Sequence, residues 1–394
     1  MSDRMAQRVQ SFGTSIFTEI SALAVQHQAV NLGQGFPDFA GPALIKEAAI
    51  KAIQADQNQY APSPGLLLLR EAISQSYAHS YGLNYDPQTE ITITSGATEA
   101  LIAAMLSVVD PGDEVIFFEP AYDAYLPDII MAGGQPRPVR LRPPSSPAEP
   151  RWRLDADELR ATFGPRTRAL VLNSPQNPTG KVFARDELEL IAQLCQKHDV
   201  IAITDEVYDR LVFQGEHIPL ASLPGMRDRT ITINSTGKTF SVTGWKIGYA
   251  LTTPALTDAV RRSHQFITFA TSTPFQAAAA AALSDAVNSS YYADLRHFYG
   301  EQRTRLQQGL QKAGFEVYMP QGSYFMLAAL PAGWNDDAAF CRYLTTEIGV
   351  AAIPLSVFYS DPGQATHFAR FCFAKSTATI NAAVERLVGM QRQR

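Results

Sequence analysis

Short apolar runs alternate with longer stretches of helical character through the middle of the chain. The apolar runs are rich in β-branched residues, four or five residues long, and separated by turn residues. Such runs are typical of strands. The predicted strands are Ile91–Thr94, Glu114–Phe118, Pro138–Leu141, Ala169–Leu172, Val200–Thr204, Thr230–Ile233 and Ile247–Leu251.

Several of these strands lack polar alternation, as expected for strands that are buried on both faces. Helices are predicted between them, among them residues 98–109 and 185–198. The alternation predicts an α/β fold with a mostly parallel seven-stranded sheet and helices on both faces. Open sheets of this kind bind ligands outside the carboxyl ends of their strands. Asp205 follows one strand and Lys238 comes soon after another, so we expect them to converge.

The C-terminal part has a different pattern. Residues 290–313 predict a long linking helix, and short strand candidates follow it at 315–318, 324–327, 350–353 and 368–373. Mixed strands and helices predict a smaller α+β domain. The predicted organisation is an N-terminal segment (1–40) that packs with the small domain, a large domain (41–289) and a small C-terminal domain (290–394). The proline-rich piece 142–147 is predicted to be a surface loop, because the strand pattern resumes after it.

Composition narrows the class of protein. A length of 394 residues exceeds what one core usually supports, and 46% apolar with 18% charged residues is typical of a globular protein. A net charge of −5 without a basic block predicts neither a nucleic-acid nor a membrane partner. The start of the chain lacks the apolar core of a secretion signal, so a cytoplasmic location is expected.

The cysteines and histidines offer little chemistry. Cys195, Cys341 and Cys372 are widely spaced and odd in number, which predicts buried free thiols in a reducing compartment. The seven histidines form no H-E-x-x-H motif or close pair, so no metal site is predicted.

Lys238 lies in the run S-T-G-K-T-F-S-V-T-G-W-K-I-G over residues 235–248. An amine among small and hydroxylated residues, with a second amine at Lys246, suits a lysine that forms an imine beside an anionic group. A lone lysine in such a loop would be an ordinary solvated one. Two upstream motifs change this interpretation: N-S-P-Q-N-P-T-G over 173–180 and V-I-A-I-T-D-E-V-Y over 200–208. In this order the three motifs resemble the pyridoxal-phosphate aminotransferases of fold type I, class I/II.

The resemblance implies pyridoxal 5′-phosphate as the cofactor and a catalytic role for Lys238, Asp205 and Tyr208. Lys238 would form the resting Schiff base and then move a proton between substrate and cofactor. Burial beside Lys246 and the cofactor's cationic ring would lower its pKa. Asp205 would keep the ring nitrogen protonated, and Tyr208 would donate to the phenolic oxygen together with Asn177.

Asp205 and Asn177 also have a simpler explanation. Asp205 could cap a turn, and Asn-Pro is common in turns. Because Asn177 must present its side chain at a fixed angle, we predict that the Asn177–Pro178 bond is cis.

The motif S-G-A-T-E over residues 95–99 follows a strand and opens a helix. Free N–H groups and the helix dipole make such a start an anion site, although it is often only a cap. The resemblance implies the following cofactor contacts: Gly96, Ala97, Thr98, Ser235 and Lys246 at the phosphate, and Tyr122 stacked on the ring.

At the substrate end, the resemblance makes Arg370 the partner of the amino-acid carboxylate, together with Asn177. An arginine among apolar strand residues is otherwise an edge or interface residue. Gly35 resembles part of a loop that covers the substrate. Tyr60 matches a tyrosine that reaches the neighbouring subunit's phosphate, which implies a homodimer with shared active sites; the alternative is a surface tyrosine.

The resemblance is strongest to bacterial methionine aminotransferases and to kynurenine/glutamine aminotransferases. Aromatic residues near the predicted mouth favour a large neutral side chain: Phe17, Phe36, Tyr60, Tyr324 and Phe325. No second arginine for a dicarboxylate is identified, although Arg261 and Arg262 are present. We therefore expect amino transfer from methionine or an aromatic amino acid to a 2-oxo acid. A C–S β-lyase on the same fold and a ligand-sensing regulator with an aminotransferase-like domain are the alternatives.

Overall fold

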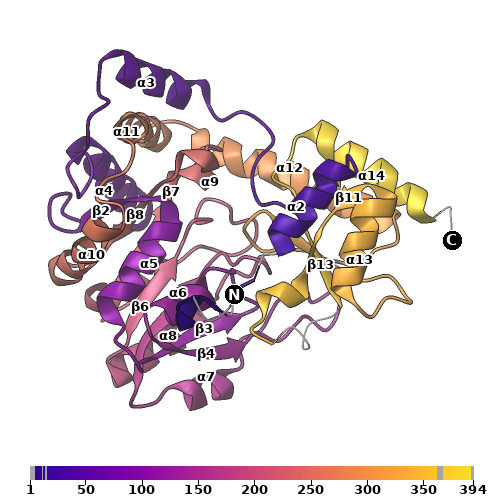
Figure 1. Cartoon of the computed structure of the whole chain (residues 1–394), viewed down its shortest axis with the longest axis horizontal. Coiled ribbons are helices and arrows are strands. Elements are labelled where there is room, and N and C mark those ends of the chain that lie inside the picture. Colours follow the sequence, from indigo (N-terminus) through magenta and orange to yellow (C-terminus); the bar gives the residue numbers. More distant parts are fainter. Residues whose placement is uncertain (1–4, 11, 14–15, 362–366, 392–394) are drawn as a thin grey trace.

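A seven-stranded sheet forms the centre of the larger part of the molecule (Figure 1). The computed structural model describes residues 5–10, 12–13, 16–361 and 367–391. The strand order is β2-β8-β7-β6-β5-β3-β4; β8 is antiparallel to both neighbours, and the other pairs are parallel. The strands are β2 (Ile91–Ser95), β3 (Glu114–Glu119), β4 (Gln135–Arg140), β5 (Thr167–Asn173), β6 (Ile201–Asp205), β7 (Thr230–Ser235) and β8 (Ile247–Leu251). The predicted seven-stranded, mostly parallel sheet is confirmed.

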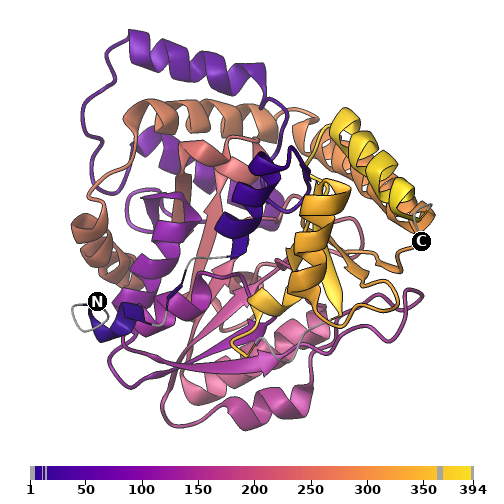
Figure 2. The same ribbon diagram turned by 45° about the vertical axis from the view of Figure 1, so that its right-hand side comes forward.

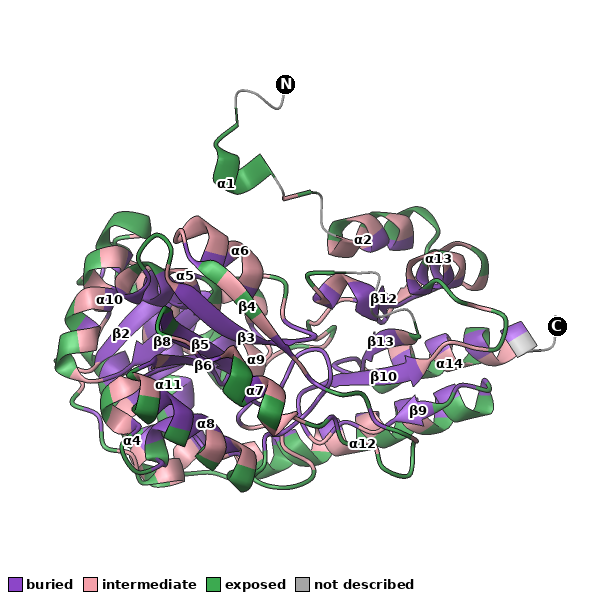
Figure 3. Cartoon of the chain, turned by 90° about the horizontal axis from the view of Figure 1, so that it is seen from below, coloured by how far each residue is buried: buried purple, intermediate pink, exposed green. Residues whose placement is uncertain are grey.

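Both faces of this sheet are buried, which explains why its strands lack polar alternation. In β3, Val115 and Phe117 join one apolar core, whereas Ile116 and Phe118 join another on the opposite face. Helices cover both faces (Figure 3). One face carries α5 (Gly96–Val108), α6 (Tyr125–Met131) and α10 (Pro254–Ile267), and the other carries α7 (Ala156–Thr162) and α8 (Arg185–His198).

A third apolar core lies at the β2 edge of the sheet. Ile91 and Ile93 of β2 and Leu251 of β8 pack there with three helices. These helices are α3 (Ala43–Gln54), α4 (Leu67–Tyr81) and α11 (Thr273–Val287). Among the described residues, no helix has the length and apolar character that a bilayer crossing needs.

The smaller part of the molecule contains a four-stranded antiparallel sheet of order β12-β13-β10-β9 (Figure 2). A separate parallel pair joins β1, near the N-terminus, to β11. The strands are β1 (Val30–Asn31), β9 (Val317–Tyr318), β10 (Phe325–Ala329), β11 (Val350–Ala351), β12 (Ile353–Pro354) and β13 (Phe368–Cys372). The helices of this part are α2 (Ile16–Gln26), α12 (Tyr291–Lys312), α13 (Asp337–Tyr343) and α14 (Thr377–Gln391). The short helix α1 (Gln7–Gln10) lies instead against α6 of the larger part.

The long helix predicted at 290–313 is confirmed as α12. The single strand predicted at 350–353 is wrong, because the chain changes partner at Ala352. β11 pairs with β1, and β12 pairs with β13. Pro354 has no N–H to donate, and it fits because β12 is the edge of its sheet. The domain boundaries at 40 and 289 stay a prediction.

Two smaller predictions are also confirmed. The three cysteines are free and buried. The Asn177–Pro178 peptide bond is cis, as are Glu119–Pro120 and Ser174–Pro175.

Candidate active site

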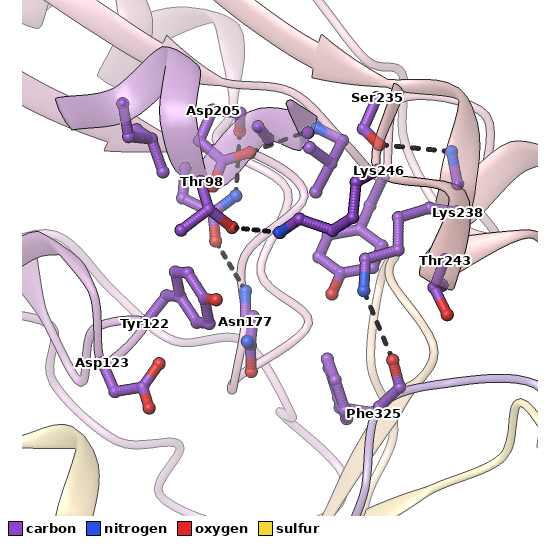
Figure 4. A pocket seen from close by; sticks show the side chains of 18 of the residues that line it. Thr98, Tyr122, Asp123, Asn177, Asp205, Ser235, Lys238, Thr243, Lys246 and Phe325 are labelled. Atoms are coloured by element: carbon purple, nitrogen blue, oxygen red, sulfur yellow. Dashed lines mark hydrogen bonds between the residues drawn. The ribbon is translucent and has the colours of Figure 1, made fainter. Parts of the chain in front are cut away.

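The sheet topology brings distant motifs together. Asn173 at the end of β5 lies beside Asp205 at the end of β6, and β7 ends next to them at Ser235. A cavity of about 320 Å³ opens at these strand ends (Figure 4). The predicted residues that line it are Gly35, Gly96, Ala97, Thr98, Tyr122, Asn177, Asp205, Tyr208, Ser235, Lys238, Lys246 and Arg370.

One end of the cavity is built as an anion site. β2 ends at Ser95 and α5 begins at Gly96, so the N–H groups of the first helical turn are free to bind a ligand. Lys246 places its amine 3.2 Å from the Thr98 hydroxyl at this helix start. Ser235 lines the same end, and it also caps the short helix that carries Lys238. The predicted phosphate contacts are therefore neighbours in space.

Two glycines make this end possible. Gly96 has φ +75°, and a Cβ there would lie 3.3 Å from the Lys246 Nζ. A Cβ on Gly248 would lie 2.3 Å from the carbonyl carbon of Gly96 and 2.5 Å from the Ala97 nitrogen. Any larger residue at position 248 would displace the start of α5. The missing side chain at Gly248 lets β8 lie against the start of α5, and the missing side chain at Gly96 leaves room beside the Lys246 amine.

A buried pair below the cavity holds the start of α5 in place. Glu99 accepts hydrogen bonds from the Ser95 N–H and, at 2.6 Å, from the ring of His264 on α10. The other ring nitrogen of His264 lies 2.8 Å from the Ser63 carbonyl. Glu99 therefore supports the turn rather than facing the ligand.

Lys238 lies at the centre of the cavity. Its amine donates to the Gly35 carbonyl at 3.3 Å and lies 5.9 Å from the centre of the Tyr208 ring. Burial lowers the pKa of Lys238 to about 8, while the nearby Asp205 acts in the opposite direction. The predicted direction of the shift is confirmed, with burial as its largest cause and Lys246 as a minor one.

Asp205 is the buried acid of the cavity. Its Oδ2 accepts a 2.6 Å hydrogen bond from the Tyr125 hydroxyl, and its Oδ1 lies 3.4 Å from the Val207 N–H. Burial raises the pKa of Asp205, and the Tyr125 hydrogen bond lowers it in part. Asp205 and Lys238 both line the cavity, as a ring held between them would require.

Arg370 occupies the opposite end and is 1% exposed. It donates to the Asn177 side-chain oxygen at 2.7 Å and to the Gly33 carbonyl at 2.8 Å, and its guanidinium lies 3.9 Å from the centre of the Phe325 ring. Because the amide oxygen of Asn177 is occupied, the amide nitrogen is the end that can donate to a ligand. The Arg370 Nε is buried without an acceptor among the described residues. Arg370 lines the cavity, so its guanidinium is available to pair with a carboxylate ligand there.

Gly35 joins the N-terminal loop to both sides of the cavity. Its carbonyl accepts from Lys238 and, at 2.5 Å, from the Tyr324 hydroxyl. The Tyr324 ring lies 5.0 Å from the Tyr208 ring, and burial raises the pKa of Tyr208. Tyr208 is therefore a neutral hydrogen-bond donor at physiological pH.

The prediction that five aromatic residues lie near the opening of the site is only partly correct. Phe17 and Phe325 line the cavity, whereas Phe36 and Tyr324 do not. Tyr324 is fully buried below the cavity, and Phe36 is 43% exposed outside it. Tyr60 is 86% exposed and packs against Phe269, with the ring centres 5.7 Å apart. The structure does not bring Tyr60 to the cavity of its own chain.

Sequence reasoning missed several residues of the site. Asn173 links two motifs, because its side chain donates to the Asp205 carbonyl at 2.8 Å and accepts from the Asn177 N–H at 2.7 Å. Asn173, Asp123 and Tyr125 all lie within or beside motifs that the sequence analysis used, so a fuller reading could have found them. Nothing in the sequence pointed to His264. The other missed residues that line the cavity are Leu101, Val207, Gly237 and Thr243.

The cavity fits the cofactor that the sequence predicts. The helix start with Lys246 offers positive charge and donors to a phosphate group, and Gly96 leaves room beside the Lys246 amine. The Tyr122 ring offers a flat face, and Asp205 and Lys238 supply an acid and an amine on the same cavity. Each group of the cofactor has a partner of suitable chemistry.

Comparison with known proteins agrees with this geometry. The chain matches the family "Aminotransferase class I and II" over residues 27–387. It is 44% identical to the probable N-succinyldiaminopimelate aminotransferase of Mycobacterium tuberculosis, over 96% of this chain and 97% of that protein. It is 41% identical to the methionine aminotransferase of Escherichia coli (96% and 97% covered) and 41% identical to human kynurenine–oxoglutarate transaminase 1 (97% and 97% covered).

Solved structures give the same result. The structure of N-succinyldiaminopimelate aminotransferase from Mycobacterium tuberculosis superposes with a TM-score of 0.93 at 44% identity, covering 98% of this chain and 100% of that one. The Escherichia coli protein YbdL, with a methionine aminotransferase function, superposes with a TM-score of 0.91 at 40% identity, covering 98% and 99%. This chain belongs to the class I and II aminotransferases, a family that depends on pyridoxal phosphate.

Proposed function

We propose that this protein is a pyridoxal-phosphate aminotransferase that takes the amino group of a neutral L-amino acid, preferably methionine or an aromatic one, and gives it to a 2-oxo acid. The observation that carries the proposal is one cavity lined by Lys238, Asp205 and the guanidinium of Arg370. The amine and the acid suit the cofactor, and the guanidinium suits an amino-acid carboxylate.

The residues of the cavity would hold each part of the cofactor. The helix start at Gly96–Thr98, Ser235 and Lys246 would bind its phosphate, and Tyr122 would stack on its ring. Asp205 would pair with the ring nitrogen, and Asn177 and Tyr208 would donate to the phenolic oxygen. When bound, the cofactor supplies an electron sink for the carbanion at the substrate α-carbon.

Lys238 would do two tasks. Its amine would link the cofactor to the chain and, once free of that link, would move a proton at the substrate α-carbon. Both tasks need a neutral amine, and a pKa of about 8 makes a useful fraction neutral at physiological pH. Arg370 would meanwhile hold the substrate carboxylate and so orient the α-carbon toward Lys238.

Covalent loading of the cofactor-free protein should depend on pH through Lys238. The loading rate should rise about tenfold per pH unit while the amine is mostly protonated, and level off above the Lys238 pKa of about 8. Stopped-flow absorbance of pyridoxal phosphate mixed with the protein measures this rate. The control is free lysine in solution whose α-amino group is blocked, so that only the side-chain amine can react. A rate that keeps rising toward pH 10, as for the control, would contradict the lowered pKa.

The preference for a neutral side chain rests on the lining of the cavity. Phe17 and Phe325 offer apolar surface near Arg370, and Asp123 would repel a second carboxylate. Among the described residues, Arg370 is the one arginine that lines the cavity. Arg261 bonds to the backbone of Gln88 and Ile91, and Arg262 pairs with Asp258 on α10.

A succinylated diaminopimelate is the second candidate donor, because the 44% identical relative from Mycobacterium tuberculosis carries that activity in its name. Profiling of amino donors decides between the candidates: methionine, phenylalanine, kynurenine and N-succinyl-LL-diaminopimelate, each with 2-oxoglutarate. We expect the highest kcat/KM for methionine or an aromatic donor. A clear preference for N-succinyl-LL-diaminopimelate would overturn the substrate assignment but not the reaction.

The C–S β-lyase alternative shares α-proton removal with amino transfer. The two differ in what must be added. A lyase releases pyruvate and ammonia from cystathionine without a 2-oxo acid, whereas a transaminase stops after one turnover. Ammonia release that continues in the absence of a 2-oxo acid would favour the lyase. The regulator alternative finds no support in the family match, which is to the aminotransferases over residues 27–387.

A homodimer with shared sites is part of the proposal. Thr98 and Lys246 are exposed at the phosphate end of the single chain, so a partner residue has access to them. Tyr60 lies in a second exposed patch, with Phe266 at 87% and Phe269 at 50% exposure. In the proposed dimer, a second copy of the chain covers these aromatic residues, and its Tyr60 reaches the first chain's phosphate end.

Mixed dimers test this sharing. Lys238→Ala chains and Tyr60→Phe chains each give a defective homodimer, but their mixed dimer would contain one complete site if Tyr60 serves the partner. Activity per intact Lys238 should therefore rise when the two variants are refolded together. If Tyr60 serves its own chain or no site, mixing will give no increase.

A further inference from the structure

Tyr125 stands directly behind the acid of the cavity. It is 3% exposed at the start of α6, and its hydroxyl donates to the Asp205 Oδ2 at 2.6 Å. Its ring also makes an edge-to-face contact with Tyr122, with the ring centres 5.6 Å apart. Tyr125 does not line the cavity itself. It therefore touches two predicted cofactor partners without reaching the cofactor.

The hydrogen bond matters because Asp205 has few other partners for its carboxylate. The Val207 N–H at 3.4 Å is a long contact, and Asp205 forms no ion pair with any described residue. Burial alone would push this carboxyl toward its neutral form. Among the groups that lower the Asp205 pKa, the Tyr125 hydroxyl is the largest, ahead of the Val207 N–H and Lys238.

The hydroxyl also fixes geometry. With Oδ2 held by Tyr125, the carboxylate cannot rotate freely, and Oδ1 is left for a ligand in the cavity. Burial raises the pKa of Tyr125 well above its ordinary value, so the phenol stays a donor at every physiological pH. A neutral donor stabilises the ionised acid without competing with a cationic ring for it.

We infer that Tyr125 is a positioning residue that keeps Asp205 ionised and aimed at the ring nitrogen of the cofactor, and so sets the affinity for a ring that can carry a proton. The inference rests on the proposed function. It predicts that Tyr125 changes the affinity for the cofactor only when the ring nitrogen is present. A residue that merely packs the core would affect all similar rings alike.

The test compares two cofactors on the cofactor-free protein. Pyridoxal phosphate has the ring nitrogen, and 1-deazapyridoxal phosphate has a C–H in its place. Tyr125→Phe removes one oxygen and keeps the ring that packs on Tyr122. It should weaken binding of pyridoxal phosphate about tenfold, because the unpaired Asp205 carboxylate takes up a proton more readily. Binding of the deaza compound should change less than about twofold, since no proton is shared there.

The chain offers a matched control. Tyr81 also donates to a buried carboxylate, the Asp209 Oδ2 at 2.7 Å, but neither residue lines the cavity. Tyr81→Phe should leave the ratio of the two dissociation constants at its native value. In an Asp205→Asn background, adding Tyr125→Phe should no longer change the affinity for pyridoxal phosphate. This double variant separates the effect on Asp205 from any loss of folding.

The outcomes are distinct. If the native chain binds neither compound, the proposed function fails and the inference fails with it. If the native chain binds pyridoxal phosphate but Tyr125→Phe leaves the ratio of the two dissociation constants unchanged, only the role of Tyr125 is refuted. An equal further loss from Tyr125→Phe in the Asp205→Asn background would likewise refute it, because the effect would not pass through Asp205.

Discussion

Replacement of Lys238 by alanine is expected to lower kcat by about four orders of magnitude or more, because one residue supplies both the covalent link and the proton transfer. The fold should survive the change. Among the described residues, the amine makes one hydrogen bond, to the Gly35 carbonyl, and that carbonyl keeps the Tyr324 hydroxyl as a partner. Borohydride reduction of the protein with pyridoxal phosphate, followed by peptide mass analysis, should label the native chain at Lys238 and leave the variant unlabelled.

Lys246 provides the control for this experiment. It lines the same cavity and also carries an amine, but that amine lies 3.2 Å from Thr98 at the helix start. Lys246→Ala should weaken cofactor binding and still be labelled at Lys238. If Lys238→Ala retained the label at another lysine and kept its activity, Lys238 would not be the linking residue.

Replacement of Arg370 by lysine is expected to reduce kcat/KM about 100-fold, mainly through KM. The Nη1 and Nη2 atoms of Arg370 donate to Asn177 and Gly33, and its Nε has no acceptor among the described residues. A lysine keeps the charge but cannot replace the planar set of N–H donors of the guanidinium. Because every amino donor and 2-oxo acid has the same α-carboxylate, the loss should be similar for all of them. Steady-state kinetics with two donors and two acceptors measures it.

The affinity of the Arg370→Lys variant for pyridoxal phosphate is an internal check, because it should change little. Arg210→Lys is the matched control. Arg210 is paired with Asp209 at 3.2 Å and stacks on Tyr292 at 4.1 Å, outside the cavity. It should lower the midpoint of thermal unfolding and leave KM unchanged. If the loss of kcat/KM in Arg370→Lys varied strongly with the donor side chain, Arg370 would bind a group other than the α-carboxylate.

The sheet and most of the site could be predicted from sequence for a simple physical reason. Buried parallel strands need continuous apolar runs, and the polar residues at their carboxyl ends have no packing role that would explain them. Asp205 ends such a run, whereas Asn177 lies beyond the end of β5, and both take their predicted roles from the resemblance of their motifs to the family. Lys238 is predicted to be catalytic only because the other motifs are present, since its local sequence alone would suit a solvated lysine.

The remaining features depend on contacts that no local pattern encodes. The bond from Tyr125 to Asp205 spans 80 residues, and the bond from His264 to Glu99 spans 165. Each joins residues on different elements whose approach is set by helix packing on the sheet. The split of the predicted strand at 350–353 has a similar cause, since it reflects a change of pairing partner rather than of residue type.

The missing side chain at Gly248 limits how this enzyme can be altered. Directed evolution of substrate range usually randomises the residues that face the substrate, and Gly248 is not one of them. Yet the neighbouring backbone lies so close that even alanine there would push against the first turn of α5. A library that includes this position would therefore be depleted of working variants, although the position never meets the amino acid being selected.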